Sequence, residues 1–317
     1  MGRHDTHMSA KMDGPIVLIT GAAGYVGRFC VRHLLAAGYG VVALDRRAAA
    51  LDPRIQSTFG DIADRPLVER LLEEHAVEVV LHLAADKSVA DSMAAPGPHL
   101  RNNVCGSLAL LEAMLARGVK KIVFSSSAAV YGTPERLPVD EQARLAPDNP
   151  YGAGKVMVEQ ALHWYHVSHG FDSVSLRYFN AAGAADDGSL GEDGAEAGNL
   201  VPRVMQALAG LSEPLSVYGT DFATATVPPS ATTSTSRTWP RPMFVRSSWS
   251  RRAGASGSST WEQAAATRFA RCCLPPSGPA VGPSLTGTHP GGPAIRPRSG
   301  RTPAPLSGFW AGGPGAI

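Results

Sequence analysis

Long hydrophobic runs and cysteines are scarce in this sequence. Although 44% of its 317 residues are hydrophobic, no window approaches the ~18 consecutive apolar residues of a membrane-spanning helix, so no membrane span is expected. Residues 1–14 hold no apolar stretch, which excludes a secretory signal and predicts a disordered leader. The four cysteines lack metal-site spacing and predict a reducing, cytoplasmic location; they are Cys30, Cys105, Cys272 and Cys273.

Net charge is also small, but it is unevenly distributed. The formal charge of +2 is the sum of two unlike segments. Residues 1–222 have 19 basic and 26 acidic side chains, a net charge of −7, whereas residues 223–317 have ten arginines and one acid, a net charge of +9. The second segment contains no Lys, Tyr or Asn, yet it holds 14 of the 25 prolines. The length favours about two domains, but this change of composition excludes two domains of ordinary globular composition.

Short apolar runs alternate with segments of helical spacing in the first segment. Strands are predicted at residues 15–20, 40–45, 56–59, 77–83, 121–125 and 173–178, and helices at residues 28–37, 66–75, 102–117 and 154–169. This alternation predicts an α/β fold with a doubly wound parallel sheet of the Rossmann type. We expect a first domain at residues 15–180 and an incomplete substrate-binding region at residues 181–222.

A glycine-rich loop follows the first predicted strand. Gly21, Gly24 and Gly27 form a GxxGxxG spacing that includes Tyr25 and opens a helix. Glycines at these positions permit a tight turn, a close approach of the backbone to a pyrophosphate, and close packing of helix on strand. The helix N-terminus favours the anion, so the loop predicts a dinucleotide cofactor.

The acid at the end of the second strand bears on which dinucleotide binds. Asp45 is placed to accept the adenosine ribose hydroxyls and would repel a 2′-phosphate, which favours NAD. Arg46 and Arg47 point towards NADP, and a turn role for Asp45 stays open. Asp61 and Ile62 end the next strand, where the carboxylate is placed either to meet the adenine amino group or to cap the helix before Pro66.

Three residue types needed for alcohol oxidation also occur together. A strand ends in Ser125-Ser126-Ser127, and Tyr151 and Lys155 stand four residues apart on one helix face. A lysine ammonium beside a phenol lowers the tyrosine pKa, so that a tyrosinate acts as base near neutral pH. The pattern predicts removal of a hydroxyl proton while hydride leaves the same carbon.

Residues 15–222 resemble the extended short-chain dehydrogenase/reductases, within the NAD-dependent epimerase/dehydratase family. The motifs that carry the resemblance are Thr20–Gly27 (TGAAGYVG), His82–Val89 (HLAADKSV), Asn102-Asn103-Val104, Ser125–Gly132 (SSSAAVYG), Tyr151–Lys155 (YGAGK) and Leu176–Ala184 (LRYFNAAGA).

The resemblance implies a role for each matching residue. Tyr151 would be the base, Lys155 its activator and a cofactor ribose ligand, and Ser127 the hydroxyl partner. Lys87 and Asn102 would line the cofactor and substrate cleft. The residues that would contact a UDP-sugar are Phe179, Asn180, Asn199 and Leu200.

The activity implied is inversion of carbon 4 in UDP-glucose and UDP-galactose. Hydride would pass from that carbon to bound NAD, the 4-keto sugar would turn over, and hydride would return to its other face. Ala128 and Ala129 stand where related dehydratases carry acids, and alanine transfers no proton. Open alternatives are a dead NAD-binding remnant and another nucleotide-sugar epimerase or oxidoreductase. The resemblance also implies a homodimer paired through helices 102–117 and 154–169.

The segment from Ala223 onward departs from the family and predicts a frameshifted tail. We reverse-translated this segment and read each codon one base early, from the last base of the preceding codon. The shifted frame permits DGTxVRDYVHVTDLAEAHVR from Thr226–Arg246 and FNLGTGxGYSVREVL from Ser259–Cys273. These are the two stretches that the family would place here. An ordinary Pro/Arg-rich extension, disordered in solution, is the alternative; polyanion binding by its arginines would be non-specific.

Three histidines share a predicted helix without supporting ligands. His163, His166 and His169 recur every three residues, but no acid or cysteine accompanies them, so no metal site is expected.

Overall fold

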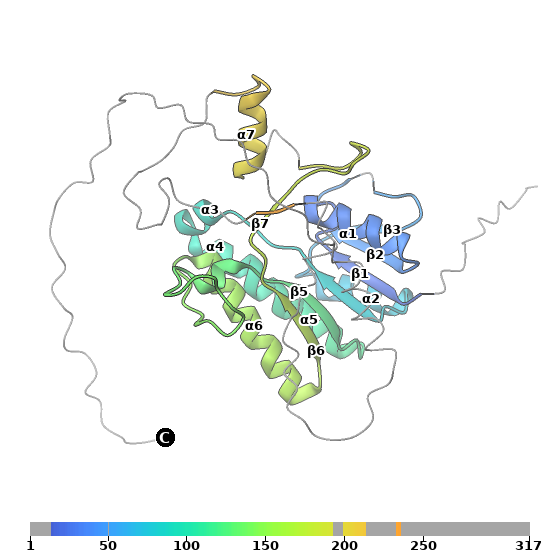
Figure 1. Cartoon of the computed structure of the whole chain (residues 1–317). Coiled ribbons are helices and arrows are strands. Elements are labelled where there is room, and N and C mark those ends of the chain that lie inside the picture. The colour runs from blue at the N-terminus through green and yellow to red at the C-terminus, as the bar shows by residue number, and fades with distance from the viewer. Residues whose placement is uncertain (1–13, 50, 193–198, 214–232, 236–317) are drawn as a thin grey trace, which may run out of the picture. The chain divides into compact units, whose positions relative to one another are not determined.

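The computed structural model describes residues 14–49, 51–192, 199–213 and 233–235 (Figure 1). All of these lie in the first of two units, residues 1–275. The predictions for residues 1–13 and for most of the tail therefore fall outside the described residues. No helix within the described ranges is long and apolar enough to cross a membrane.

A six-stranded parallel sheet forms the centre of this unit, in the order β3-β2-β1-β4-β5-β6. The strands are β1 (Ile16–Thr20), β2 (Gly40–Asp45), β3 (Gln56–Phe59), β4 (Val79–His82), β5 (Lys121–Ser125) and β6 (Asp172–Leu176). The strand order reverses direction between β1 and β4. This reversal confirms the doubly wound fold, and in such sheets ligands bind outside the carboxyl ends of the strands at the point of reversal.

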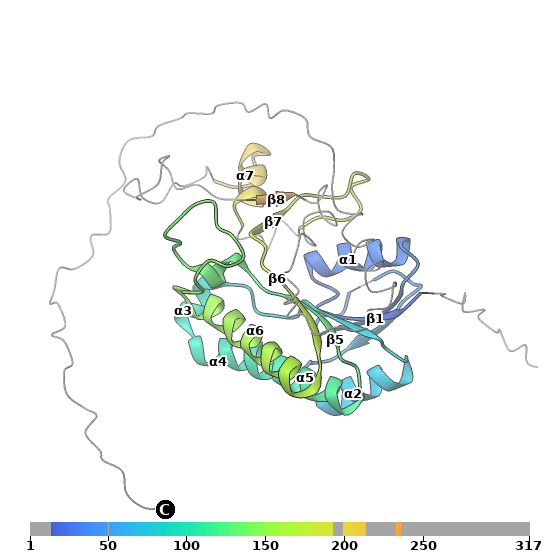
Figure 2. The same ribbon diagram turned by 60° about the horizontal axis from the view of Figure 1, so that its bottom comes forward.

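Helices cover both faces of the sheet (Figure 2). The helix α1 (Tyr25–Ala36) lies on one face, and α2 (Arg65–Glu74), α5 (Gly106–Ala116) and α6 (Pro150–His169) lie on the other. Alternate residues of β1 explain this arrangement: Val17 and Ile19 are buried with the α1 side chains, whereas Leu18 is buried with those of α2, α5 and α6. Strand side chains alternate between faces, so one apolar run supplies two cores.

Several elements were not predicted. Two short helices, α3 (Val89–Ala94) and α4 (Pro96–Leu100), follow β4, and a π-helix over Arg101–Cys105 then leads into α5. The predicted helix 102–117 therefore begins with a wide turn, and the predicted helix 154–169 begins earlier, at Pro150.

Three further elements lie beyond β6. They are β7 (Asn180–Ala182), α7 (Leu200–Leu208) and β8 (Thr233–Thr235). Strand β8 pairs in parallel with β7 and lies in the segment from Ala223 onward. Threonine favours strands, and the backbone of β7 supplies the hydrogen-bonding edge.

Candidate active site

The glycine-rich loop joins β1 to α1 with little room for side chains. Gly21 has φ of +76°, and a Cβ there would lie 2.7 Å from Ala84 N. A Cβ on Gly27 would clash with the carbonyl oxygen of Gly21. Gly24 is the N-cap of α1 and supplies no side-chain cap, so the helix N-terminus is suited to an anion. Tyr25 donates its hydroxyl to Gly183 O at 2.6 Å.

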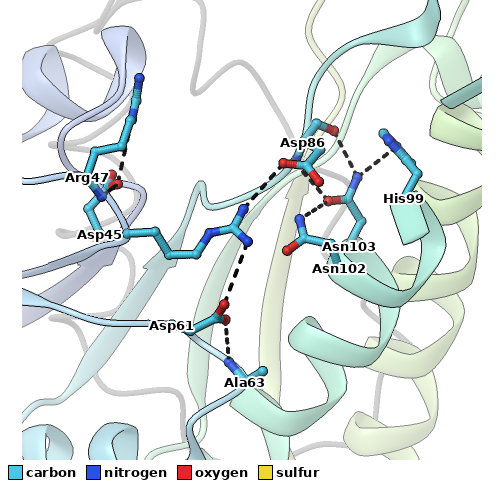
Figure 3. A network of polar contacts seen from close by, with 9 residues as sticks. Asp45, Arg47, Asp61, Ala63, Asp86, His99, Asn102 and Asn103 are labelled. Carbon is cyan, nitrogen blue, oxygen red and sulfur yellow. Dashed lines mark hydrogen bonds and ion pairs between the residues drawn. The ribbon is translucent and has the colours of Figure 1, made fainter. Parts of the chain in front are cut away.

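Asp45 is anchored to this loop at the end of β2. Its carboxylate accepts hydrogen bonds from Ala23 N at 2.9 Å and from Arg47 N at 2.8 Å. Arg46 spans two other acids, with Nη1 3.6 Å from Asp61 and Nη2 3.3 Å from Asp86 (Figure 3). The structure thus places the two predicted acids, Asp45 and Asp61, at or just after the ends of neighbouring strands, and Arg46 pairs with Asp61 rather than with Asp45.

The capping role considered for Asp61 is wrong. Asp64 is the N-cap of α2 and accepts from Leu67 N, whereas Asp61 accepts from Ala63 N in the preceding turn (Figure 3). Ile62 is buried and faces Gly106 at the start of α5. Asp61 therefore keeps its position at the cofactor edge, close to the end of β3.

Ser127, Tyr151 and Lys155 converge beside the carboxyl end of β5. Ser127 caps the short 3-10 helix Ala128–Tyr131, and its hydroxyl acts to lower the pKa of the Tyr151 phenol. Lys155 lies one turn along α6, with Nζ 5.6 Å from the centre of the Tyr151 ring. Asn149 starts the helix by accepting from Gly152 N at 2.9 Å. The structure thus brings together the three predicted catalytic residues.

The expected lowering of the tyrosine pKa is not found. Burial raises the pKa of Tyr151, and the Ser127 hydrogen bond opposes that rise. Lys155 Nζ donates to Ser125 O at 2.7 Å, so its charge is directed at the strand end. Burial lowers the pKa of Lys155 to about 8, against the attraction of Glu159. Such perturbed groups in a crevice are typical of catalytic sites.

A buried ion pair behind this triad was missed in the sequence. Glu159 accepts from Arg177 Nε at 3.0 Å and from the hydroxyl of Ser126. Arg177 also donates to Tyr131 OH at 3.0 Å. Tyr151, Lys155 and Glu159 recur every four residues along α6, so extending the YxxxK spacing by one turn would have identified the glutamate.

The predicted substrate residues lie at the same edge but are less closely assembled. Lys87 Nζ is 3.3 Å from Glu192 Oε1, which also accepts from Asn199 Nδ2 at 2.6 Å. Glu192 is thus a half-buried partner of two predicted ligands, a contact that its loop position had not indicated. Phe179 and Leu200 are exposed.

The remaining predicted residues lie on β7 and the π-helix. Asn180 begins β7. Asn102 donates to Asn103 Oδ1 at 2.9 Å (Figure 3). The three helical histidines belong to no cluster of three potential metal ligands among the described residues.

Sequence comparison matches residues 17–224 to the NAD dependent epimerase/dehydratase family. Among curated relatives, the chain is 42% identical over 212 residues to UDP-glucose 4-epimerase of Lacticaseibacillus casei, covering 66% of this chain and 64% of that one. It is also 42% identical over 214 residues to UDP-glucose 4-epimerase of Azospirillum brasilense, covering 66% of this chain and 62% of the relative. The chain thus spans less than two thirds of these relatives' length.

Solved structures show the same relationship. A UDP-glucose 4-epimerase from Brucella ovis in complex with NAD superposes with a TM-score of 0.63 at 38% identity, covering 67% of this chain and 66% of that one. The enzyme from Bifidobacterium longum in complex with NAD⁺ and UDP gives 0.62 at 37% identity, covering 66% and 67%. Together with the glycine loop, Asp45 and the converging triad, these matches establish that the chain belongs to the NAD dependent epimerase/dehydratase family.

Proposed function

We propose that this chain carries the catalytic half of an NAD-dependent enzyme that interconverts UDP-glucose and UDP-galactose. The observation that carries the proposal is the convergence of Ser127, Tyr151 and Lys155 at the carboxyl edge of the sheet, where the glycine loop and Asp45 also lie. The relatives that match these residues are named as UDP-glucose 4-epimerases.

The residues present fit a dinucleotide. The N-terminus of α1 is left without a side-chain cap by Gly24, and it would hold the pyrophosphate. Asp45 is already oriented by Ala23 N, so its outer lone pairs would accept ribose hydroxyls. The pairing of Arg46 with Asp61 and Asp86 supports NAD over NADP, because binding a 2′-phosphate would require breaking both ion pairs.

The triad supplies the proton chemistry. When bound, NAD would oxidise carbon 4 of the sugar by two electrons and later reduce it. Tyr151 would take the proton of the 4-hydroxyl and return it, while Ser127 would hold the same oxygen by its hydrogen bond. Burial favours the neutral phenol of Tyr151, and Ser127 favours the tyrosinate that would act as base.

The residues of the short helix after β5 support epimerisation rather than dehydration. Ala128 and Ala129 occupy its first turn, where no side chain is able to exchange a proton with the neighbouring carbons. Lys87, Phe179, Asn180, Asn199 and Leu200 would bind the UDP-sugar. The second hypothesis is a catalytically inactive protein that still binds NAD, because the family match ends at residue 224.

We also propose that the tail is translated out of frame. The division would then be a leader at 1–14, a cofactor domain at 15–180, a partial substrate region at 181–222 and an aberrant segment at 223–317. Support comes from the end of the family match at residue 224 and from the two family stretches that the shifted frame permits, in order. Resequencing the locus decides this: an intact frame without family-like sequence in the shifted frame would refute the frameshift.

A homodimer and a cytoplasmic location complete the proposal. On α6, the side chains of Met157, Trp164 and Val167 are exposed, which supports pairing of that helix with a second copy. Cys30 and Cys105 are free thiols, which supports a reducing compartment.

Conversion of UDP-galactose to UDP-glucose tests the proposed activity. Two proteins are compared: the chain as it stands and a chain in which the shifted frame is restored after Ala225. We expect turnover in the restored chain and little or none in the other. Absence of turnover in the restored chain, with NAD bound, would refute the assigned reaction. Equal turnover in both would refute the claim that the tail impairs the enzyme.

A further inference from the structure

We propose that His99 is a positioning residue for Tyr151, and that Asn103 holds the His99 ring as the tautomer with its proton on Nδ1. The proposal rests on the proposed function only in that Tyr151 is taken as the base. The contacts themselves stand independently of turnover. They run from the loop after β4, through the π-helix, to the first turn of α6.

The orientation of the Asn103 side chain is fixed by the backbone of Asp86. Asp86 N donates to Asn103 Oδ1 at 2.8 Å, and Asn103 Nδ2 donates to Asp86 O at 2.9 Å (Figure 3). A backbone N–H only donates and a carbonyl only accepts. If the amide nitrogen and oxygen exchanged places, the nitrogen would face Asp86 N, donor against donor, and the oxygen would face Asp86 O, acceptor against acceptor. Since Asn103 is 4% exposed, water would not relieve that mismatch.

This fixed amide determines the state of the neighbouring imidazole. The second hydrogen on Asn103 Nδ2 is directed at His99 Nε2, at a distance of 2.9 Å. Because the amide nitrogen donates, Nε2 has to accept and carries no proton. A neutral ring then has its proton on Nδ1. His99 is 5% exposed, so the ring has little freedom to leave this arrangement.

The ring so held lies against Tyr151. The two ring centres are 6.0 Å apart with an interplanar angle of 75°, an edge-to-face contact. Gly154 lets this part of α6 approach closely, since a Cβ there would lie 3.3 Å from Leu100 and 3.6 Å from Val104. The groups described around Tyr151 are therefore Ser127, Lys155, Tyr178 and His99. His99 limits the movement of the phenol on the side of α4.

The π-helix between Leu100 and Gly106 has a role in this arrangement. It carries Asn103 one turn beyond His99, and its wide turn directs the amide towards both Asp86 and the imidazole. Such π-helical turns occur frequently at functional sites. The carboxylate of Asp86 also pairs with Arg46. Asp86 therefore contacts Asn103 through its backbone and Arg46, beside the proposed adenosine site, through its side chain.

Nitrogen NMR of the full chain labelled with ¹⁵N-histidine tests the tautomer. The His99 signals are identified by their loss in His99→Gln. We expect Nε2 to show the shift of an unprotonated nitrogen and Nδ1 that of a protonated one. In Asn103→Asp the carboxylate has no proton to donate, so His99 Nε2 should become protonated. A protonated Nε2 in the parent chain, or no change in Asn103→Asp, would overturn the assignment.

Ultraviolet difference titration of Tyr151 tests the positioning role. The signal is identified by subtracting that of Tyr151→Phe. His99→Gln keeps an acceptor for Asn103 but removes the ring, which admits water; we expect the midpoint of Tyr151 to fall by about 0.5 unit or more. His99→Phe keeps the ring, and we expect the midpoint to stay near that of the parent. The matched control is His163→Gln, at an exposed position on α6, which should leave the midpoint unchanged.

The outcomes separate this proposal from the proposed function. An unchanged midpoint in His99→Gln, or equal shifts in His99→Gln and His99→Phe, would overturn the positioning role. If His99→Gln fails to fold by circular dichroism, the His99 signals are identified by their loss in His99→Phe, and the absence of a tautomer change in Asn103→Asp would then overturn the proposal. Neither readout requires turnover, so an inactive restored chain would refute the reaction and leave the His99 geometry as found.

Discussion

At the scale of single residues, the catalytic centre depends on where charges are directed. Lys155 is buried and donates to Ser125 O at 2.7 Å, so its ammonium holds the end of β5 beside Ser127. Sequence spacing alone suggested that this charge acts on the phenol. The difference arises because a spacing of four residues fixes the shared helix face, whereas burial and the available acceptor decide which group the side chain contacts.

His82 shows how much more the structure specifies than the sequence did. Ser107 Oγ donates to Asn103 O at 2.5 Å, so it accepts from His82 Nε2, and His82 Nδ1 accepts from Thr20 Oγ1 at 2.8 Å. His82 ends β4 and is a packed core histidine, with 2% exposure. Its partners come from β1 and α5, which are distant in sequence and were not predictable from spacing.

The first prediction concerns His82 and pH. Burial, helped by Lys155, lowers the pKa of His82 from 6.5 to about 3. Between these values the unfolded chain binds more protons than the folded one, so the free energy of unfolding rises with pH across this window and falls as pH decreases through it. The slope is up to about 1.4 kcal/mol per pH unit. Urea unfolding measures it.

His82→Gln provides the comparison, because its amide can replace both hydrogen bonds without titrating. The variant should lose this part of the pH dependence, whereas His163→Gln should retain it. A parent slope identical to that of His82→Gln would contradict the assigned neutral state.

At the scale of elements, α6 carries most of the site because one of its faces meets the end of β5. Tyr151, Lys155 and Glu159 recur on that face, and they contact Ser127, Ser125 and Ser126 in turn. The strands and long helices were predictable because their apolar periodicity is strong. Helix α4 was not, since Pro96 and Pro98 break the helical pattern over its five residues.

The second prediction concerns the ion pair between α6 and the end of β6. Replacing Glu159 with Ala leaves Arg177, which is largely buried, without its carboxylate, and should lower the free energy of unfolding by about 2–4 kcal/mol. The control is Asp187→Ala, which breaks an exposed pair with Arg32 and should change the free energy of unfolding far less. Chemical denaturation measures both. Equal losses would show that the buried pair has no special role.

At the scale of the whole molecule, composition and homology divide the chain at nearly the same place. The acidic segment ends at residue 222 and the family match ends at residue 224. Periodicity predicted the sheet and the cofactor edge in the first segment. It did not predict how the proposed substrate residues lie, because the apolar side chains of α7 are not packed in a core: Leu200, Met205 and Leu208 are exposed.

The third prediction concerns assembly. If α6 pairs with a second copy, Trp164→Glu should bury a charge in the interface and convert a dimer into a monomer. Light scattering after size-exclusion chromatography of the frame-restored chain measures this. Leu137→Glu is the control, since Leu137 is also exposed but lies outside α5 and α6. A monomer before any substitution, or a dimer that Trp164→Glu leaves intact, would contradict pairing through α6.

The central claim is that Tyr151 is the base of an NAD-dependent 4-epimerase, and one substitution tests it most directly. Turnover of UDP-galactose is measured in the frame-restored chain, in its Tyr151→Phe variant, and in Tyr165→Phe, which makes the same change on the same helix against Phe171. We predict that Tyr151→Phe lowers kcat by about 10²–10⁴-fold and that Tyr165→Phe stays close to the parent. Turnover in Tyr151→Phe equal to that of the parent would contradict the account.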